Sequence, residues 1–166
     1  MVDAKGNAAD TPLRTLVTVA EADFDIGELQ VWLLTGSGKE GAVATFTGYV
    51  RVDGDGMQCM ELEHYPGMTQ SAIEAIVAQA AQRWPLLAAR VVHRVGRLHP
   101  GEQIVWVGVS SAHRAAAFSA CEFIMDYLKA EAPLWKKEIN DAGEHWVEAK
   151  DTDSERARRW RGNDGE

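Results

Sequence analysis

Cysteine is scarce in this chain of 166 residues, in which Cys59 and Cys121 are the only two. They lie far apart, without a CxxC pair and without histidines at zinc-ligand spacing, so a structural zinc site is disfavoured. Two isolated cysteines suit a reducing compartment. No apolar run approaches the roughly 20 residues of a membrane span, and the N-terminus lacks the core of a signal peptide. We therefore expect a soluble cytoplasmic protein without a membrane partner.

Basic residues are also in the minority, because 17 Lys and Arg face 25 Asp and Glu and the net charge is −8. This balance disfavours nonspecific binding to nucleic acid or anionic membranes, so a basic site must be a local pocket. The glycine-rich phosphate loops and the serine or cysteine nucleophile motifs are missing. The five histidines never pair at i, i+4, and we expect neither a metal nor a cofactor.

The composition that remains is that of a folded domain. Apolar residues make up 46% of the chain and six are Trp, which excludes a disordered chain. The length fits one domain with a real core. Polar ends predict flexible tails at residues 1–14 and 161–166, which leaves a single domain at residues 15–160. Strand and helix patterns mix without regular βαβ alternation, which favours the α+β class.

The local patterns predict strands and helices in a definite order. Strands are expected at residues 16–20, 42–50, 58–65, 90–95, 103–110 and 145–150. Short helices are expected from Asp25 to Leu34, from Thr69 to Arg83 and from Asp153 to Arg159, with Asp25 and Thr69 as N-caps. The second and third strands could form a hairpin across the loop at residues 52–57, although this loop is longer than the commonest types.

The stretch at residues 110–138 holds the strongest pattern, a long amphipathic helix capped by Ser110 or Ser111. Pro133 should end it near Glu131. His113 and Arg114 sit in its first turn, where the helix dipole favours anions, and free N–H groups beside two cations suit a phosphate or carboxylate.

A second cluster of cations follows this helix. Lys129, Lys136 and Lys137 surround the apolar segment at residues 132–135, and they are as compatible with a solvated helix end as with a site. Glu61 and Glu63 face one side of a strand and fit a solvated face better than an acid pair. A cationic set remains and implies an anionic ligand: Arg51, His113, Arg114, Lys129 and Lys136.

Several long motifs resemble the large, catalytic subunit of molybdopterin synthase. The match covers roughly Ala42 to Trp160 in unbroken order, and its motifs are TFTGYVR, LEHYPGM, HRVGRLHPGE, VGVSSAHRAAAF, FIMDYLKAEAPLWKKE and WVEAK. The resemblance implies an α/β hammerhead-like fold with additional antiparallel β structure. It also implies a homodimer of large subunits, flanked by two small ubiquitin-like sulfur carriers in a heterotetramer. The implied reaction moves two sulfurs from the carriers' C-terminal Gly-Gly thiocarboxylates to cyclic pyranopterin monophosphate, which gives the dithiolene of molybdopterin.

The resemblance also assigns roles to individual positions. Lys129 and Lys136 match the catalytic lysines, and the substrate-binding positions are Tyr49, Val50, Arg51, His113, Arg114, Lys137 and Glu138. The chain departs from some relatives at His145 and Lys150, where they carry arginine. Lysine lacks the bidentate guanidinium fork, so a phosphate contact by Lys150 is weakened.

Two other classes of function compete with this interpretation. One is a noncatalytic adaptor that binds a protein C-terminal tail in the cationic groove. The other is a sulfurtransferase that carries a persulfide on Cys121 or Cys59. Neither class explains the clustered Arg, His and Lys residues as well as sulfur transfer to an anionic substrate does.

Overall fold

The computed structural model describes residues 12–52 and 56–163, which form a mixed α+β domain of two sheets and four α-helices. The strands are β1 Arg14–Ala20, β2 Ala42–Tyr49, β3 Cys59–His64, β4 Ala88–Arg94, β5 Gly96–Leu98, β6 Gln103–Ser111, β7 Leu134–Asn140 and β8 Gly143–Val147. The helices are α1 Ile26–Trp32, α2 Met68–Arg83, α3 Arg114–Glu131 and α4 Asp151–Arg158, and a 3-10 turn follows at Arg161–Asn163. The α+β expectation is confirmed. Most of the N-terminal range expected to be a flexible tail lies outside the described residues, and β1 already begins at Arg14.

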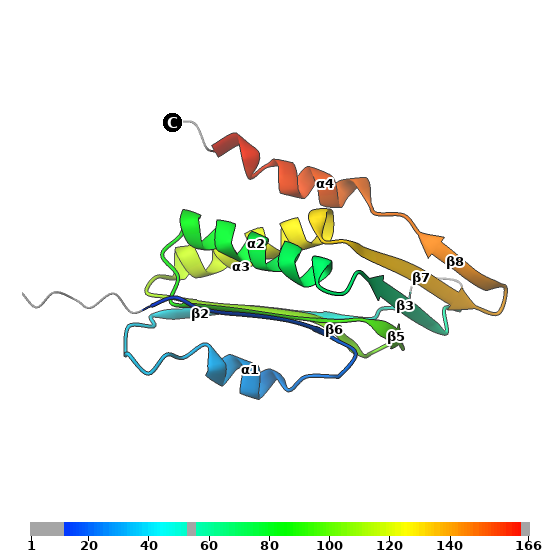
Figure 1. The fold of residues 1–166 in the computed structure, drawn as a ribbon, viewed down its shortest axis with the longest axis horizontal. Coiled ribbons are helices and arrows are strands. Elements are labelled where there is room, and N and C mark those ends of the chain that lie inside the picture. The colour runs from blue at the N-terminus through cyan, green and yellow to red at the C-terminus, as the bar shows by residue number, and fades with distance from the viewer. Residues whose placement is uncertain (1–11, 53–55, 164–166) are drawn as a thin grey trace, which may run out of the picture.

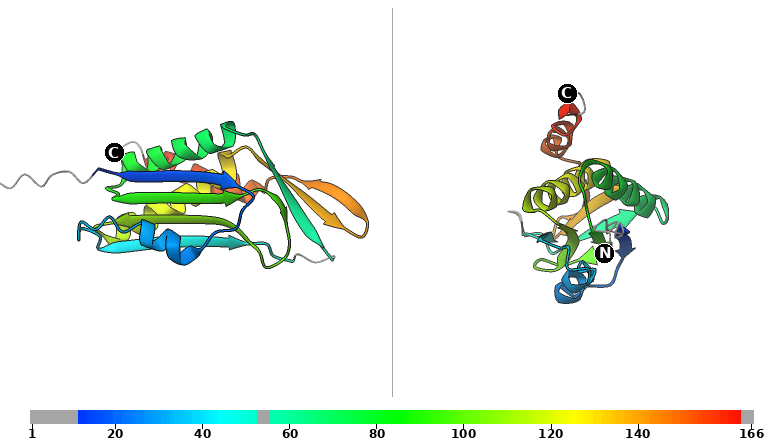
Figure 2. Two further views of the ribbon diagram at one scale, coloured as in Figure 1. Left: turned by 60° about the horizontal axis from the view of Figure 1, so that its bottom comes forward. Right: turned by 90° about the vertical axis from the view of Figure 1, so that its left-hand side faces the viewer.

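The larger sheet has the order β1-β4-β6-β2, with β1 parallel to β4 and the other pairs antiparallel. Helices α2 and α3 cover one face and α1 covers the other, which makes the layers visible in Figures 1 and 2. Successive side chains of β4 alternate between these layers: Ala89 and Val91 pack toward α2 and α3, and Ala88 and Val92 pack toward α1. Gly108 lets α1 approach closely, because a Cβ there would lie 2.7 Å from Leu33 Cδ1.

The smaller sheet has the order β5-β3-β7-β8 and extends from one end of the larger one (Figure 1). It has a separate small core of Val50, Met57, Met60, Leu62 and Leu98. The expected hairpin between the second and third strands is wrong, because β2 pairs with β6 whereas β3 pairs with β5 and β7. Strand β7 was not expected at all. It forms through pairing with β3, a contact between segments far apart in the chain.

The central helix begins later than the sequence predicts. Ser110 and Ser111 are the buried end of β6 and do not cap α3, since their hydroxyls donate to the carbonyls of Leu33 and Pro85. His113 occupies the N-cap position and makes no side-chain cap hydrogen bond. The predicted end at Glu131 is confirmed. Pro133 explains it, because a residue before proline is driven out of helical geometry and Ala132 has ψ 130°.

The remaining helix ends agree with the sequence in part. Asp25 caps α1 by accepting from the Glu28 N–H, and α2 stops at the Trp84-Pro85 pair as expected. Thr69 does not cap α2. Its buried hydroxyl instead donates to the Pro133 carbonyl and so ties the start of α2 to the segment that follows α3.

Helix α4 lies alongside α3 (Figure 1). Charged side chains attach the two helices to each other. Asp126, 6% exposed, accepts hydrogen bonds from Arg156 Nε at 3.1 Å, from Arg159 at 2.9 Å and from Trp160 Nε1 at 2.8 Å. Glu122 pairs with the same two arginines. This cluster matters for the site because it places the first turn of α4 beside the carboxyl end of α3.

Candidate active site

Helix α3 separates the two cationic groups that the sequence places on it. His113 and Arg114 are exposed at its start, and Lys129 lies in its last turn. The helix is continuous over 18 residues. At 1.5 Å per residue, His113 and Lys129 are therefore about 24 Å apart along the axis. A single chain does not bring these residues together.

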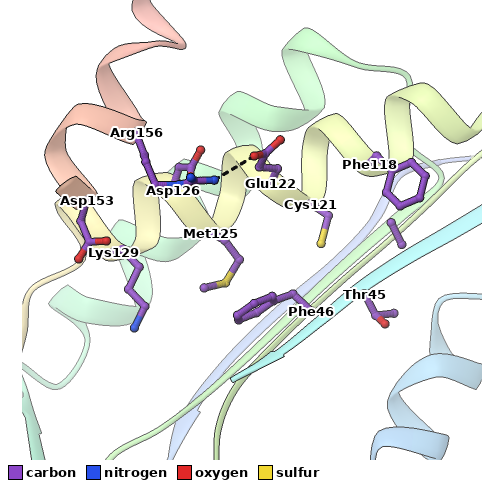
Figure 3. Close-up of a pocket in the computed structure, with 11 residues that line it drawn as sticks. Thr45, Phe46, Phe118, Cys121, Glu122, Met125, Asp126, Lys129, Asp153 and Arg156 are labelled. Atoms are coloured by element: carbon purple, nitrogen blue, oxygen red, sulfur yellow. Dashed lines mark hydrogen bonds and ion pairs between the residues drawn. The ribbon is translucent and has the colours of Figure 1, made fainter. Parts of the chain in front are cut away.

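A pocket of about 630 Å³ opens between β2, α3 and α4, with Lys129 at one end (Figure 3). Its lining is Ala44, Thr45, Phe46, Phe118, Cys121, Glu122, Met125, Asp126, Lys129, Asp153 and Arg156. Aromatic and sulfur side chains form the wall, whereas the acidic and basic groups gather where α4 crosses α3 (Figure 3). Such a pocket offers an apolar surface beside a cation, an arrangement common in small-molecule sites.

The pKa of Lys129 is lowered from its ordinary value. Desolvation is the main cause, and the positive charges of Lys136 and Lys150 act in the same direction while Asp153 opposes them. Lys129 nevertheless remains in part exposed to solvent in the isolated chain. The ammonium group is thus easier to deprotonate than a surface lysine, as a residue that moves protons requires.

Strand β7 divides its three predicted site residues between two faces. Lys136 and Glu138 share one face with Met60 and Leu62, and their side chains form an ion pair at 3.4 Å. Glu138 also lies 3.4 Å from His145 Nε2, so His145 occupies this face as well.

Lys137 points to the opposite face of β7. Its Nζ is 3.4 Å from Glu144, 4.0 Å from Glu63 and 4.6 Å from the centre of the Trp146 ring. These contacts hold Lys137 away from Lys136, since neighbouring strand residues face opposite ways.

The segment predicted to bind substrate after β2 is placed firmly by its backbone. Val50 is buried, its N–H donates to the Glu102 carbonyl and its own carbonyl accepts from Gly101. Tyr49 and Arg51 on either side of it are exposed. The loop beyond Arg51 continues into residues 53–55, which lie outside the described residues. Lys150 is exposed at the N-cap position of α4 and contributes its charge to the surroundings of Lys129.

Two neighbours of Lys129 carried no recognised signal in the sequence. Asp153 was expected only as part of a charged helix, and its approach to Lys129 depends on how α4 packs. His93 is next to Arg94 in β4, and the two side chains face opposite ways. His93 is buried, and the charges of Lys129 and His64 act on it. No pattern of local spacing would have found either residue.

Comparison with known proteins identifies the family of this chain. The family model described as "MoaE protein" matches residues 19–131. The chain belongs to the MoaE protein family. The molybdopterin synthase catalytic subunit of Salmonella typhimurium is 53% identical over 148 residues, which cover 88% of this chain and 98% of that protein. The Ralstonia nicotianae protein of the same name is 56% identical over 146 residues, which cover 87% of this chain and 83% of that protein.

The fold agrees with this membership. The solved structure of the MoaE protein from Burkholderia ambifaria superposes with a TM-score of 0.76 at 49% identity, covering 88% of this chain and 97% of that one. The resemblance seen in the sequence motifs is thereby confirmed, and the activity of this MoaE chain is that of a molybdopterin synthase catalytic subunit.

Two further findings concern what the MoaE chain contains. Across the described residues, no group of three or more His, Cys, Asp or Glu side chains is arranged to hold a metal ion. None of the helices in the same part of the chain has the length and hydrophobicity that crossing a bilayer requires.

Proposed function

We propose that this chain transfers two sulfurs to cyclic pyranopterin monophosphate. The donor is the C-terminal thiocarboxylate of a small ubiquitin-like carrier, and the product is the dithiolene of molybdopterin. The observation that carries the proposal is Lys129, whose pKa is lowered at the end of an apolar pocket close to Lys136 and Lys150. The chemistry of this step takes place in the cytoplasm.

The charges suit the reaction at each stage. The substrate carries a phosphate, and attack by the thiocarboxylate sulfur builds negative charge on the pterin side chain and on the acyl group. Positioned cations stabilise such charge more strongly than water does. Lys129 and Lys136 supply them at the reacting atoms, with Lys129 as the group that moves a proton.

The cysteines of this chain are poorly suited to carry the sulfur. Both are buried and free, and burial raises the pKa of Cys121 to about 12. A thiol with so high a pKa holds little of the nucleophilic thiolate at neutral pH. The sulfur therefore arrives already activated on the carrier.

The carrier tail reaches the lysines through a narrow entry. A diglycine tail is thin and lets its backbone approach closely, so its terminal carboxylate meets the ammonium groups of Lys129 and Lys136. A carboxyl-activating crosslinker should join the tail to one of these two lysines. Attachment at Lys39 or Lys150 instead would place the entry elsewhere.

Two copies of the chain complete each site. His113 and Arg114 lie about 24 Å from Lys129 along α3, and a pyranopterin monophosphate is roughly half that long. If the α3 helices of two chains run in opposite directions, one supplies His113 and Arg114 for the phosphate where the other supplies Lys129 and Lys136. A two-fold axis then generates two shared sites. Phe46 and Phe118, which are 43% and 65% exposed beside α3, leave an apolar surface for this contact.

The deciding experiment mixes the chain with thiocarboxylated carrier and cyclic pyranopterin monophosphate. Dithiolene product, detected by mass spectrometry, is the expected result, and carrier with an ordinary C-terminal carboxylate is the control. Binding of the carrier without product would favour the adaptor. Product that requires a cysteine persulfide on this chain would favour the second alternative.

A further inference from the structure

His93 is a buried histidine at the carboxyl end of β4, with 3% of its surface exposed. Ala89 and Val91, on the same face of the strand, belong to the core that includes α2 and α3. Side chains alternate along a strand, so the His93 ring also points toward the α2 and α3 layer. Arg94 points the other way and donates to the carbonyls of Glu21 and Gln103.

One nitrogen of the His93 ring is already occupied. Nδ1 lies 2.8 Å from the carbonyl oxygen of Arg94. A carbonyl can only accept, so Nδ1 carries the hydrogen, and in the neutral ring Nε2 is an unprotonated acceptor. Burial is the main reason that the pKa of His93 falls to about 4, so the ring is neutral at physiological pH.

The groups that face His93 are basic. Lys129 from α3 and His64 from β3 both lower its pKa through their charge. His64 is opposite Leu134 and Leu62 is opposite Lys136, which makes His64 and Lys136 diagonal neighbours on one face of the smaller sheet. His93 is opposite Val105 near the start of β6, and α3 runs back from the end of β6. His93 and the carboxyl end of α3, which carries Lys129, therefore lie at the same end of the larger sheet.

Lys129 is surrounded unevenly by charge. Asp153 supplies a negative group from α4, while Lys136 of β7 and Lys150 before α4 supply positive ones. In Figure 3 the Lys129 side chain extends from α3 with its nitrogen at the far end, away from the body of the helix. His93 offers a neutral ring nitrogen as an acceptor. Among the described residues no direct hydrogen bond joins the two side chains, so contact requires a change of the lysine rotamer or one bridging water.

We propose that His93 is a positioning residue for Lys129, and that its Nε2 accepts a hydrogen bond from the lysine ammonium, directly or through one water. The bond orients Nζ toward the reacting atoms and stabilises its protonated form. A carboxylate in this place would form a fixed ion pair, whereas a neutral acceptor leaves the lysine able to release its proton. The role in catalysis rests on the proposed function, but the ionisation of Lys129 can be measured on the chain alone.

Two substitutions of His93 test the roles of its two ring nitrogens one at a time. In His93→Asn the amide can still donate to the Arg94 carbonyl, as Nδ1 does, but nothing replaces Nε2. In His93→Gln the longer side chain can present an acceptor near the Nε2 position and loses the local donor. If His93 positions Lys129, the Asn variant should stay folded and lose about tenfold or more in kcat, and the Gln variant should keep most of its kcat despite a lower Tm.

The pKa of Lys129 provides a readout that does not depend on activity. It can be followed from the ¹³Cε shift in a pH titration, with the signal assigned by Lys129→Arg. Loss of an acceptor should lower this pKa by about one pH unit in His93→Asn and leave it near the wild-type value in His93→Gln. His99→Phe, an exposed histidine with contacts to Glu102, serves as the control and should change neither quantity.

The possible outcomes test the positioning role of His93 and the proposed function separately. A Lys129 pKa that is the same in the Asn variant and the wild type overturns the positioning role, whatever happens to kcat. So does an active Asn variant beside an inactive Gln variant, because His93 would then serve only the fold. If the wild type forms no dithiolene while the pKa still falls in the Asn variant, the proposed function fails and the positioning of Lys129 stands. If the Gln variant does not fold, the comparison of Asn with wild type still decides.

Discussion

Complementation between two damaged chains tests the shared site directly. One chain carries His113→Ala and Arg114→Ala, and the other carries Lys129→Ala. Each should be almost inactive alone, because every homodimer site lacks either the phosphate contacts or the lysine. In a heterodimer with shared sites, one site collects both defects and the other collects none.

The expected recovery follows from the geometry. The spacing of about 24 Å along α3 prevents one chain from supplying both groups to one substrate. Random mixing of equal amounts makes about half of all dimers heterodimers, and each has one intact site out of two. Activity should therefore rise from near zero to about one quarter of the wild-type rate per chain.

The assay needs proof that subunits have exchanged. Two affinity tags of different mass, purified in sequence, isolate the heterodimer, whose activity should be about half of wild type. The control is a mixture of two separately tagged Lys129→Ala chains, which should stay inactive. A purified heterodimer that forms no dithiolene would refute the shared site, and with it the antiparallel arrangement of the two α3 helices.

Four further predictions concern single features of the chain. Lys129→Ala should lose about a hundredfold in product formation and keep its Tm within a few degrees, because a pocket lysine contributes little to stability. The double variant Cys59→Ser, Cys121→Ala should retain turnover, since the carrier brings the activated sulfur. Asp126→Ala should lower the free energy of unfolding by about 2–3 kcal/mol and the Tm by about 5–10 °C, because it leaves three donors of the α4 segment without their acceptor. The pKa of His93 is about 4 in the folded chain and 6.5 in the unfolded chain, so only the unfolded chain gains this proton as the pH falls between those values. Roughly 2–3 kcal/mol of the free energy of unfolding should therefore be lost over that pH range, as measured by urea titrations.

Controls sharpen these four results. Glu131→Ala removes the exposed pair with Arg161 and should cost about 0.5 kcal/mol or less, in contrast to Asp126→Ala. His93→Asn should flatten the acid-side loss of stability. A Lys129→Ala chain that unfolds, or that turns over normally, would end the catalytic assignment of this lysine. A folded but inactive cysteine double variant would revive the persulfide mechanism.

The elements set by local chemistry were the ones that the sequence predicted well. Pro133 ends α3 and Asp25 caps α1 through contacts within a few residues, so their signals are visible in the sequence. Strand β7 was missed because its strand geometry depends on pairing with β3, and its lysines were equally compatible with a helix end. The hairpin between β2 and β3 was predicted wrongly for the same reason, because the true partners of both strands lie far away in the chain.

The candidate site, like the fold, could be predicted from the sequence only in part. The motifs indicate Lys129 and Lys136 because the resemblance matches residue by residue. Asp153, which opposes the lowering of the Lys129 pKa, and His93, whose own pKa Lys129 lowers, both lie far from Lys129 in sequence and meet it through packing. Local spacing contains no information on such contacts. The separation of Lys137 from Lys136 was predictable from strand alternation, but only once β7 was known to be a strand.

The two sheets have separate hydrophobic cores, and the two predicted catalytic lysines belong to different ones. Lys129 projects from the helix packed on the larger core, whereas Lys136 stands on a strand beside the smaller cluster around Met60 and Leu62. Regions with so few buried contacts open at a lower free energy than the main core. We therefore expect the smaller sheet to open before the larger one on heating. Product formation should then be lost at a lower temperature than the helical structure, because the two lysines would separate before α3 unfolds.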